Sequence, residues 1–195
     1  MADRRAEVTR KTNETAVTVT LSLDGTGSAD VQTGVAFLDH LLTSLAKHAR
    51  FDLTLQCAGD TAVDDHHTAE DCALALGQAL DEALGERRAI RRFGHAFAPL
   101  DEALAQAVVD LSGRPFSVVD LELTREKLGD LACENIEHVV RSMAVTARAC
   151  IHLDVLRGEN NHHKAEAAFK ALALALRQAV KSGSGDDVPS TKGSL

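Results

Sequence analysis

Two short segments of the chain carry the same set of side chains that can bind a metal ion. Residues 64–70 read DDHHTAE and residues 160–166 read NNHHKAE. On a helix, the first histidine of each pair and the glutamate four positions later lie on one face, while the second histidine points to another side. The side chains concerned are His66, His67, Glu70, His162, His163 and Glu166. This geometry favours two metal ions rather than one.

Each pair has a further histidine upstream, His40 in the first case and His138 in the second. The intervening segments have similar lengths, 25 and 23 residues. Six histidines and two glutamates would fill two sites of three imidazoles and one carboxylate. One site would take His162, Glu166, His67 and one upstream histidine, and the other would take His66, Glu70, His163 and the other upstream histidine. Such ligands suit Mn, Fe, Co, Ni or Zn, and spacing alone does not choose among these metals.

The rest of the chain predicts the elements that would position these side chains. Residues 15–23 alternate polar and apolar side chains, as strands do, and residues 105–123 read as two strands joined near SGRP. An Ala/Leu-rich segment with helical periodicity follows each histidine pair. Each upstream histidine lies in an expected helix that is followed by a strand. We therefore predict an α+β fold with an internal duplication into two similar halves, each a β-sheet packed against two helices.

The repeated order of elements also predicts the boundaries within a single compact domain. The first half would cover residues 1–90 and the second residues 91–182, and residues 183–195 would form a C-terminal tail with the sequence VPSTKG. Asp64 and Asp65 are expected to cap the helix that follows them, as are Asn160 and Asn161 in the second half.

Composition restricts the class of protein. A net charge of -8 and the absence of Trp and Tyr argue against a nucleic-acid binder. No run approaches the roughly 18 apolar residues of a membrane span, and the N-terminal MADRRAEVTR has no apolar core of a signal peptide. The four cysteines have no C-x-x-C spacing, which indicates reduced thiols. We expect a cytoplasmic protein without a nucleic-acid or membrane partner.

Several longer motifs make the chain similar to one enzyme family over nearly its whole length. They are RKTNET, LDGTG, FLDHLL, DDHHTAED, IRRFG, DLSGRP, NNHHKAEAAFKA and VPSTKG. With these motifs the chain resembles the imidazoleglycerol-phosphate dehydratases of histidine biosynthesis. The resemblance implies a carbon–oxygen lyase that dehydrates imidazole-glycerol phosphate to imidazole-acetol phosphate. It also implies two manganese ions per active site and a shell of twenty-four subunits, in which neighbouring subunits share the metal sites.

The resemblance assigns the upstream histidines that geometry leaves open. It implies one metal site made of His40, His67, His162 and Glu166, and another made of His66, Glu70, His138 and His163. It further implies substrate contacts from the metal ligands His40, His66, His67, Glu70 and His162, and from Glu14, Lys47, His48, Arg92, Arg114, Lys170, Ser190, Thr191 and Lys192. Ser44 stands where family members often have a longer glutamine, so a phosphate contact there is not expected.

The reaction needs a base because the proton that leaves sits on a carbon with no carbonyl beside it. Glu14 is the candidate, since it is the substrate-contacting carboxylate outside the ligand set. Holding a substrate hydroxyl is the other role open to it. Two alternative functions are a dinuclear metallohydrolase, which usually needs a bridging carboxylate that this ligand set lacks, and a metal-stapled storage shell, which would not need the Arg and Lys set.

Overall fold

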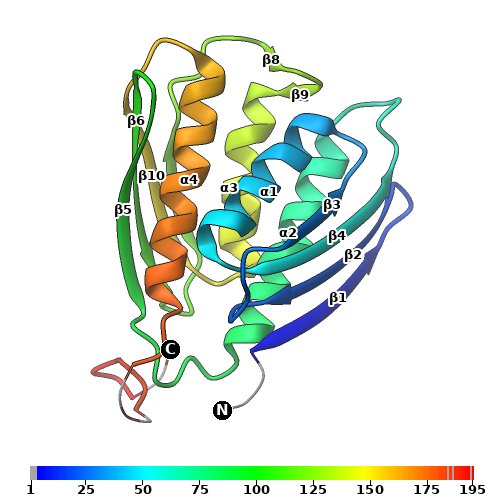
Figure 1. Cartoon of the computed structure of the whole chain (residues 1–195). Coiled ribbons are helices and arrows are strands. Elements are labelled where there is room, and N and C mark those ends of the chain that lie inside the picture. The colour runs from blue at the N-terminus through cyan, green and yellow to red at the C-terminus, as the bar shows by residue number, and fades with distance from the viewer. Residues whose placement is uncertain (1–3, 184, 186, 194) are drawn as a thin grey trace.

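Two four-stranded sheets enclose a layer of four helices (Figure 1). The computed structural model describes residues 4–183, 185, 187–193 and 195; residues 184, 186 and 194 of the expected tail lie outside the described residues. The first half contains β1 (Arg5–Lys11), β2 (Thr15–Ser22), β3 (Ala29–Gln32), α1 (Ala36–Ala49), β4 (Asp52–Gly59) and α2 (His66–Leu84). The second half contains β5 (Phe93–Leu100), β6 (Ala103–Asp110), β7 (Phe116–Asp120), β8 (Lys127–Leu128), β9 (Leu131–Ala132), α3 (Cys133–Thr146), β10 (Cys150–Arg157) and α4 (Asn161–Ala179).

The two large sheets have the same topology. Their strand orders are β1-β2-β4-β3 and β5-β6-β10-β7. In each sheet the first three strands pair antiparallel, and the last strand pairs parallel to its neighbour. The predicted α+β fold with two similar halves is thereby confirmed. The small β8-β9 ladder is an addition to the second half, in the β7–α3 connection.

Alternating side chains fix which face of each sheet meets the helices. In β2, Val17, Val19 and Leu21 are buried, whereas Thr18 is exposed. Many of the buried side chains of α2 and α4 are alanines. Because these side chains are short, neighbouring helices and strands can pack close to both helices. Across the middle layer, α2 packs against α3 and α1 packs against α4. One continuous apolar core therefore joins the two halves.

Gly94 on β5 shows how tight this packing is. A Cβ atom at this position would lie 1.9 Å from the Ala175 carbonyl oxygen and 2.9 Å from the Ala179 amide nitrogen, both on α4. We expect Gly94→Ala to lower the free energy of unfolding by about 1–3 kcal/mol or more, because backbone atoms must move. Urea denaturation measures this. Gly183→Ala is the control, since its Cβ would lie 3.7 Å from the nearest atom; equal midpoints for both variants would contradict the packing argument.

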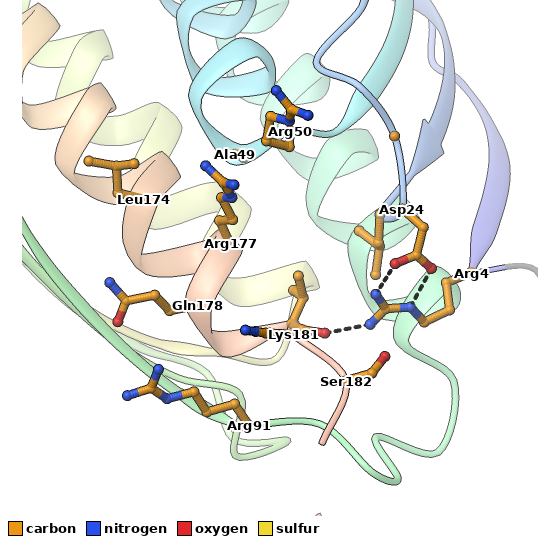
Figure 2. Close-up of a pocket in the computed structure, with 13 residues that line it drawn as sticks. Arg4, Asp24, Ala49, Arg50, Arg91, Leu174, Arg177, Gln178, Lys181 and Ser182 are labelled. Atoms are coloured by element: carbon orange, nitrogen blue, oxygen red, sulfur yellow. Dashed lines mark hydrogen bonds and ion pairs between the residues drawn. The ribbon is translucent and has the colours of Figure 1, made fainter. Parts of the chain in front are cut away.

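A cleft of about 720 Å³ opens where α1 and α4 end (Figure 2). Its lining carries the basic side chains Arg4, Arg50, Arg91, Arg177 and Lys181. Of these, Arg4 is ion-paired with Asp24, which also lines the cleft. No histidine lines the cleft, so the chemistry expected from the repeated motifs is not located here.

Candidate metal and substrate site

Two groups of three potential ligands form at the opposite end of the helical layer. His40 on α1 meets His162 and Glu166 on α4, and in the other group His138 on α3 meets two residues of α2, namely His66 and Glu70. Within each group one ligand atom from each residue lies within 4.8 Å of the others. The two groups are equivalent under the duplication: each joins an HHxxE helix to a helix of the other half.

The first group is arranged around the Glu166 carboxylate. Glu166 Oε2 lies 3.2 Å from His40 Nε2 and 3.2 Å from His162 Nε2. Lys170, one turn further along α4, places Nζ 2.7 Å from Glu166 Oε1. Burial alone would raise the pKa of Glu166, but hydrogen bonds from Lys170 and His40 outweigh it and lower this pKa to about 2. Glu166 is therefore an anion with an oxygen atom directed at two imidazoles.

The second group has the same form. Glu70 Oε1 lies 2.9 Å from His138 Nε2, and the His66 and His138 rings stack with centroids 4.8 Å apart. On α3, Asn135 Oδ1 lies 2.9 Å from His66 Nδ1. Since an amide oxygen can only accept, His66 carries its proton on Nδ1 and keeps Nε2 free to bind a metal.

His67 and His163 lie outside both groups, among the residues that the structure describes. His67 Nδ1 lies 3.0 Å from Asp60, and His163 Nδ1 lies 2.7 Å from Glu102. These hydrogen bonds raise the pKa of each histidine above its usual value. Consequently each group has three of its four predicted ligands from one chain.

Asp65 does not cap α2 with its side chain, so this capping prediction is wrong. Its Oδ2 instead accepts hydrogen bonds from the Ala132 amide and from Asn135 Nδ2, at 2.7 and 3.0 Å. The same Asn135 orients His66, so Asp65 connects the start of α2 to α3 through the site. In the second half, Asn160 accepts a hydrogen bond from the His162 amide, which confirms capping by Asn160, whereas Asn161 is the first residue of α4 and its Oδ1 accepts from the Thr124 and Arg125 amides.

Acid titration of Asp65 gives a testable stability effect. Burial works to raise its pKa, but hydrogen bonds led by that from Asn135 lower it to about 2. A depressed carboxyl pKa contributes stability that is present above the unfolded pKa of about 4 and is lost as the pH falls toward 2. We expect Asp65→Asn to cost about 2 kcal/mol at pH 7 and to flatten the loss of stability between pH 4 and 2. Denaturant unfolding across this range checks it; parallel curves for variant and wild type would contradict it.

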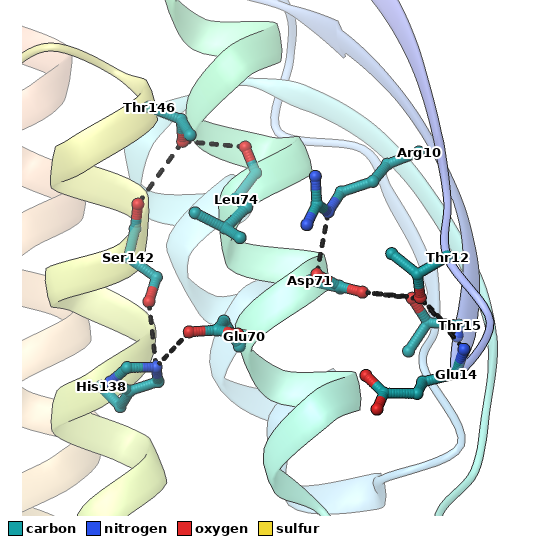
Figure 3. A network of polar contacts seen from close by, with 10 residues as sticks. All are labelled: Arg10, Thr12, Glu14, Thr15, Glu70, Asp71, Leu74, His138, Ser142 and Thr146. Carbon is teal, nitrogen blue, oxygen red and sulfur yellow. Dashed lines mark hydrogen bonds and ion pairs between the residues drawn. The ribbon is translucent and has the colours of Figure 1, made fainter.

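The β1–β2 turn carries Glu14 to the side of α2 that bears Asp71, whereas Glu70 and His138 lie on the other side of this helix (Figure 3). Asp71 on α2 anchors this turn: it accepts hydrogen bonds from Arg10 Nε at 2.8 Å and from the Thr15 hydroxyl. The exposed Glu14 carboxylate then lies 3.7 Å from His67 Nε2. The candidate base is thus next to a predicted metal ligand.

The predicted substrate contacts fall into two sets in space. His48 lies two turns after His40 on α1, and Lys170 lies beside Glu166. Burial, together with the charge of Lys170, lowers the pKa of His48. Lys47 is exposed on the same helix. This set borders the first ligand group.

The other set lies at the far end of α4. The Arg92 amide donates to the Ala179 carbonyl, and Arg92 Nη1 donates to the Pro189 carbonyl at 2.7 Å. An added Cβ at Gly113, next to Arg114, would lie 2.5 Å from the Leu195 carbonyl carbon. Arg92, Arg114 and the tail with Ser190, Thr191 and Lys192 are therefore gathered together.

The length of α4 separates these two sets. Ala179 follows His162 by 17 residues along the helix, which is about 26 Å at 1.5 Å per residue. The guanidinium of Arg92 also forms two hydrogen bonds with the Asp110 carboxylate, at 2.7 and 3.1 Å. One small phosphorylated molecule cannot touch His162 and the tail of the same chain.

The ligand groups fit transition-metal ions on their chemistry. Each brings imidazole nitrogens and one carboxylate oxygen together, with the imidazoles directed inward. Free Cys57, Cys72, Cys133 and Cys150 take no part in either group. Imidazole and carboxylate suit manganese and its neighbours in the first transition series.

Comparison with known proteins gives the family. The sequence model of imidazoleglycerol-phosphate dehydratase matches residues 33–176. The chain is 58% identical to imidazoleglycerol-phosphate dehydratase from Phaffia rhodozyma, over 98% of this chain and 96% of that protein. The chain belongs to the imidazoleglycerol-phosphate dehydratase family. It is thus a dehydratase of histidine biosynthesis, as its motifs predicted.

Solved structures of imidazoleglycerol-phosphate dehydratases have the same fold. The enzyme from Staphylococcus aureus superposes with a TM-score of 0.83 at 35% identity, over 91% of this chain and 99% of that one. IGPD from Pyrococcus furiosus, solved in complex with (S)-C348, gives 0.83 at 37% identity, over 96% of this chain and 100% of that one. In the part of the chain that the structure describes, no helix has the length and apolarity to cross a membrane.

Sequence reasoning missed four polar residues around the site. Asn135, Asp60 and Glu102 each meet a histidine, and Asp71 holds the turn that carries Glu14. Only Asp71 had a local signal, since it directly follows Glu70 in the repeated motif. Asn135 and Glu102 lie 69 and 61 residues from the histidines that they meet, and Asp60 lies in the connection before α2, so residue spacing does not indicate them.

Proposed function

We propose that this dehydratase holds two divalent transition metals, manganese by family resemblance, and converts imidazole-glycerol phosphate to imidazole-acetol phosphate. The observation that supports this proposal best is the pair of equivalent groups, His40 with His162 and Glu166, and His66 with Glu70 and His138. His67 and His163 would supply the fourth ligand of each metal. When bound, the two metals would act as Lewis acids that stabilise negative charge on the two nitrogens of the substrate ring.

The remaining side chains would orient the substrate and move its proton. Glu14, next to His67, would take the proton from the carbon chain of the substrate. Lys170 and His48 border the first ligand group, so they would meet the end of the substrate that leads toward the phosphate. Arg114 and Lys192 would bind the phosphate, with paired donors from the guanidinium. Arg92 would hold the tail in place through Pro189 and add charge beside it.

The separation along α4 implies that each active site would combine residues from more than one chain. Because His162 and the tail of one chain lie about 26 Å apart, the tail would serve a site on another chain. His67 and His163 lie outside the groups of their own chain and would likewise complete metal sites across subunits. These requirements fit a closed assembly of many copies, and the twenty-four-subunit shell of cubic symmetry is the form we propose.

A direct assay tests the proposal. Protein stripped of metal and then loaded with Mn²⁺ is expected to bind two ions per chain, measured by elemental analysis, and to form a ketone from imidazole-glycerol phosphate. Glu14→Gln is expected to keep both ions and to lose about 10²–10⁴-fold in kcat. Active protein without any transition metal would overturn the metal assignment. Near-normal turnover of Glu14→Gln with full metal would overturn the role of Glu14.

The arrangement of the site supports neither a dinuclear hydrolase nor a storage shell. A dinuclear hydrolase usually has a bridging carboxylate, and each group here contains one glutamate bound among its own histidines. A storage shell would not gather Arg92, Arg114 and Lys192 around an anchored tail.

A further inference from the structure

His67 and His163 are held by carboxylates from unrelated parts of the two halves. Asp60 lies in the β4–α2 connection, six residues before His66. Glu102 lies in the turn between β5 and β6, and is 61 residues from His163 in sequence. The duplication therefore conserved the hydrogen bond to the second histidine while the residue that accepts it changed.

Lengths of the connecting loops explain the change. Residues 60–65 join β4 to α2, whereas only residues 158–160 join β10 to α4. Gly158, the first residue after β10, occupies the place of Asp60 and has no side chain to offer. Glu102 fills this gap from the neighbouring hairpin, with Oε2 2.7 Å from His163 Nδ1.

Both contacts decide which ring nitrogen carries the proton. A carboxylate can only accept, so it favours a proton on Nδ1 and leaves Nε2 with its lone pair. The Nε2 atom of His67 then faces Glu14 at 3.7 Å, and that of His163 faces Asp101 at 3.8 Å. A carboxylate behind a ligating imidazole also fixes the ring orientation and makes the ligand more basic.

The two carboxylates differ in how firmly they are held. Glu102 Oε1 accepts hydrogen bonds from the backbone amides of Glu159 and Asn160, at 3.1 and 2.8 Å, just before α4 begins. The Asp60 carboxylate contacts only His67 among the described residues, at 3.0 and 3.3 Å. Glu102 is thus the more rigid support.

We propose that Asp60 and Glu102 are positioning residues that hold His67 and His163 with Nε2 presented outward, ready to complete a metal site carried by another copy of the chain. This inference rests on the proposed function, because it gives the two histidines their role as fourth ligands. It assigns a separate carboxylate to each of the two metals.

Metal titration of the full-length protein tests the proposal. Asp60→Ala and Glu102→Gln are each expected to weaken one of the two Mn²⁺ sites by about 10–100-fold and to leave the other unchanged. The thermal midpoint of the metal-free protein should stay close to wild type for Asp60→Ala. Glu159→Gln is the control, since Glu159 is exposed and it is its backbone amide, which the substitution keeps, that donates to Glu102. Asp60→Glu should restore part of the lost affinity.

A second measurement separates this proposal from the proposed function. Nitrogen-15 NMR of the metal-free chain at pH 8 is expected to show His67 and His163 protonated on Nδ1, and Asp60→Ala should move the His67 proton to Nε2. Wild-type affinities in both variants, or protons on Nε2 in the wild type, would overturn the positioning role even if two metals bind. A wild-type chain that binds no Mn²⁺ would instead overturn the proposed function.

Discussion

His162→Asn is expected to lower kcat by at least about 10³-fold, because it removes a ligand of the metal that would bind the substrate ring. Lys192→Ala, in the tail, is expected to lower kcat/KM by about 10²-fold through the loss of a phosphate contact. Each variant alone should therefore be nearly inactive at low substrate concentration. Neither residue packs in the apolar core, so both variants should fold.

Mixing the two variants should restore activity. If an active site takes His162 from one chain and the tail from another, random assembly of equal amounts gives intact sites about a quarter of the time. The distance of about 26 Å along α4 is the observation from which we infer such sharing. The measurement is kcat/KM after metal removal, mixing and reassembly with Mn²⁺. Variants reassembled separately and then mixed serve as the control, and they should show no recovery.

The outcome that contradicts this prediction is clear. A site built from one chain would contain a mutated residue in every copy, so activity of the mixture would stay at the mean of the two variants. That result would show that the tail bends back to its own histidines, and the arrangement of Arg92, Pro189 and the tail described above would not be the active one.

The duplication and the ligand groups could be predicted from the sequence because their signals are local. Helical periodicity places a histidine and a glutamate four residues apart on one face whatever surrounds them. Spacing left open which of the upstream histidines, His40 or His138, joins His162 and which joins His66. Family motifs then assigned each upstream histidine to a group.

The supporting residues could not be predicted because their contacts depend on three-dimensional packing. The sequence position of Asp65 predicts a helix cap. Its carboxylate instead accepts hydrogen bonds from Ala132 and Asn135, about 70 residues away in sequence, because β9 and α3 pack against the start of α2. Glu102 lies in a hairpin turn, and nothing in its neighbours shows that the turn meets α4. The separation of Arg92 from His162 likewise becomes visible only in the structure, where His162 lies at the start of α4 and Arg92 hydrogen-bonds to Ala179 at its end.

Removal of metal, or mild acid, is expected to break the assembly into much smaller particles. If His67 and His163 complete sites on other subunits, each metal links two chains, and a chelator at pH 8 removes these links. Binding to Asp60 and Glu102 raises the pKa of both histidines, so they take up protons at a higher pH than an ordinary histidine. Protons therefore compete with metal at these two ligands as the pH falls.

Size-exclusion chromatography with light scattering measures this dissociation. We expect the particle to shrink on chelation at pH 8, to reassemble when Mn²⁺ returns, and to shrink without chelator as the pH falls from 7 to 5. The double variant His67→Ala with His163→Ala should behave as the chelated protein does at every pH. A particle whose size is the same with and without chelator would show that contacts other than metal hold the subunits together, and the role of both histidines as links between chains would be lost.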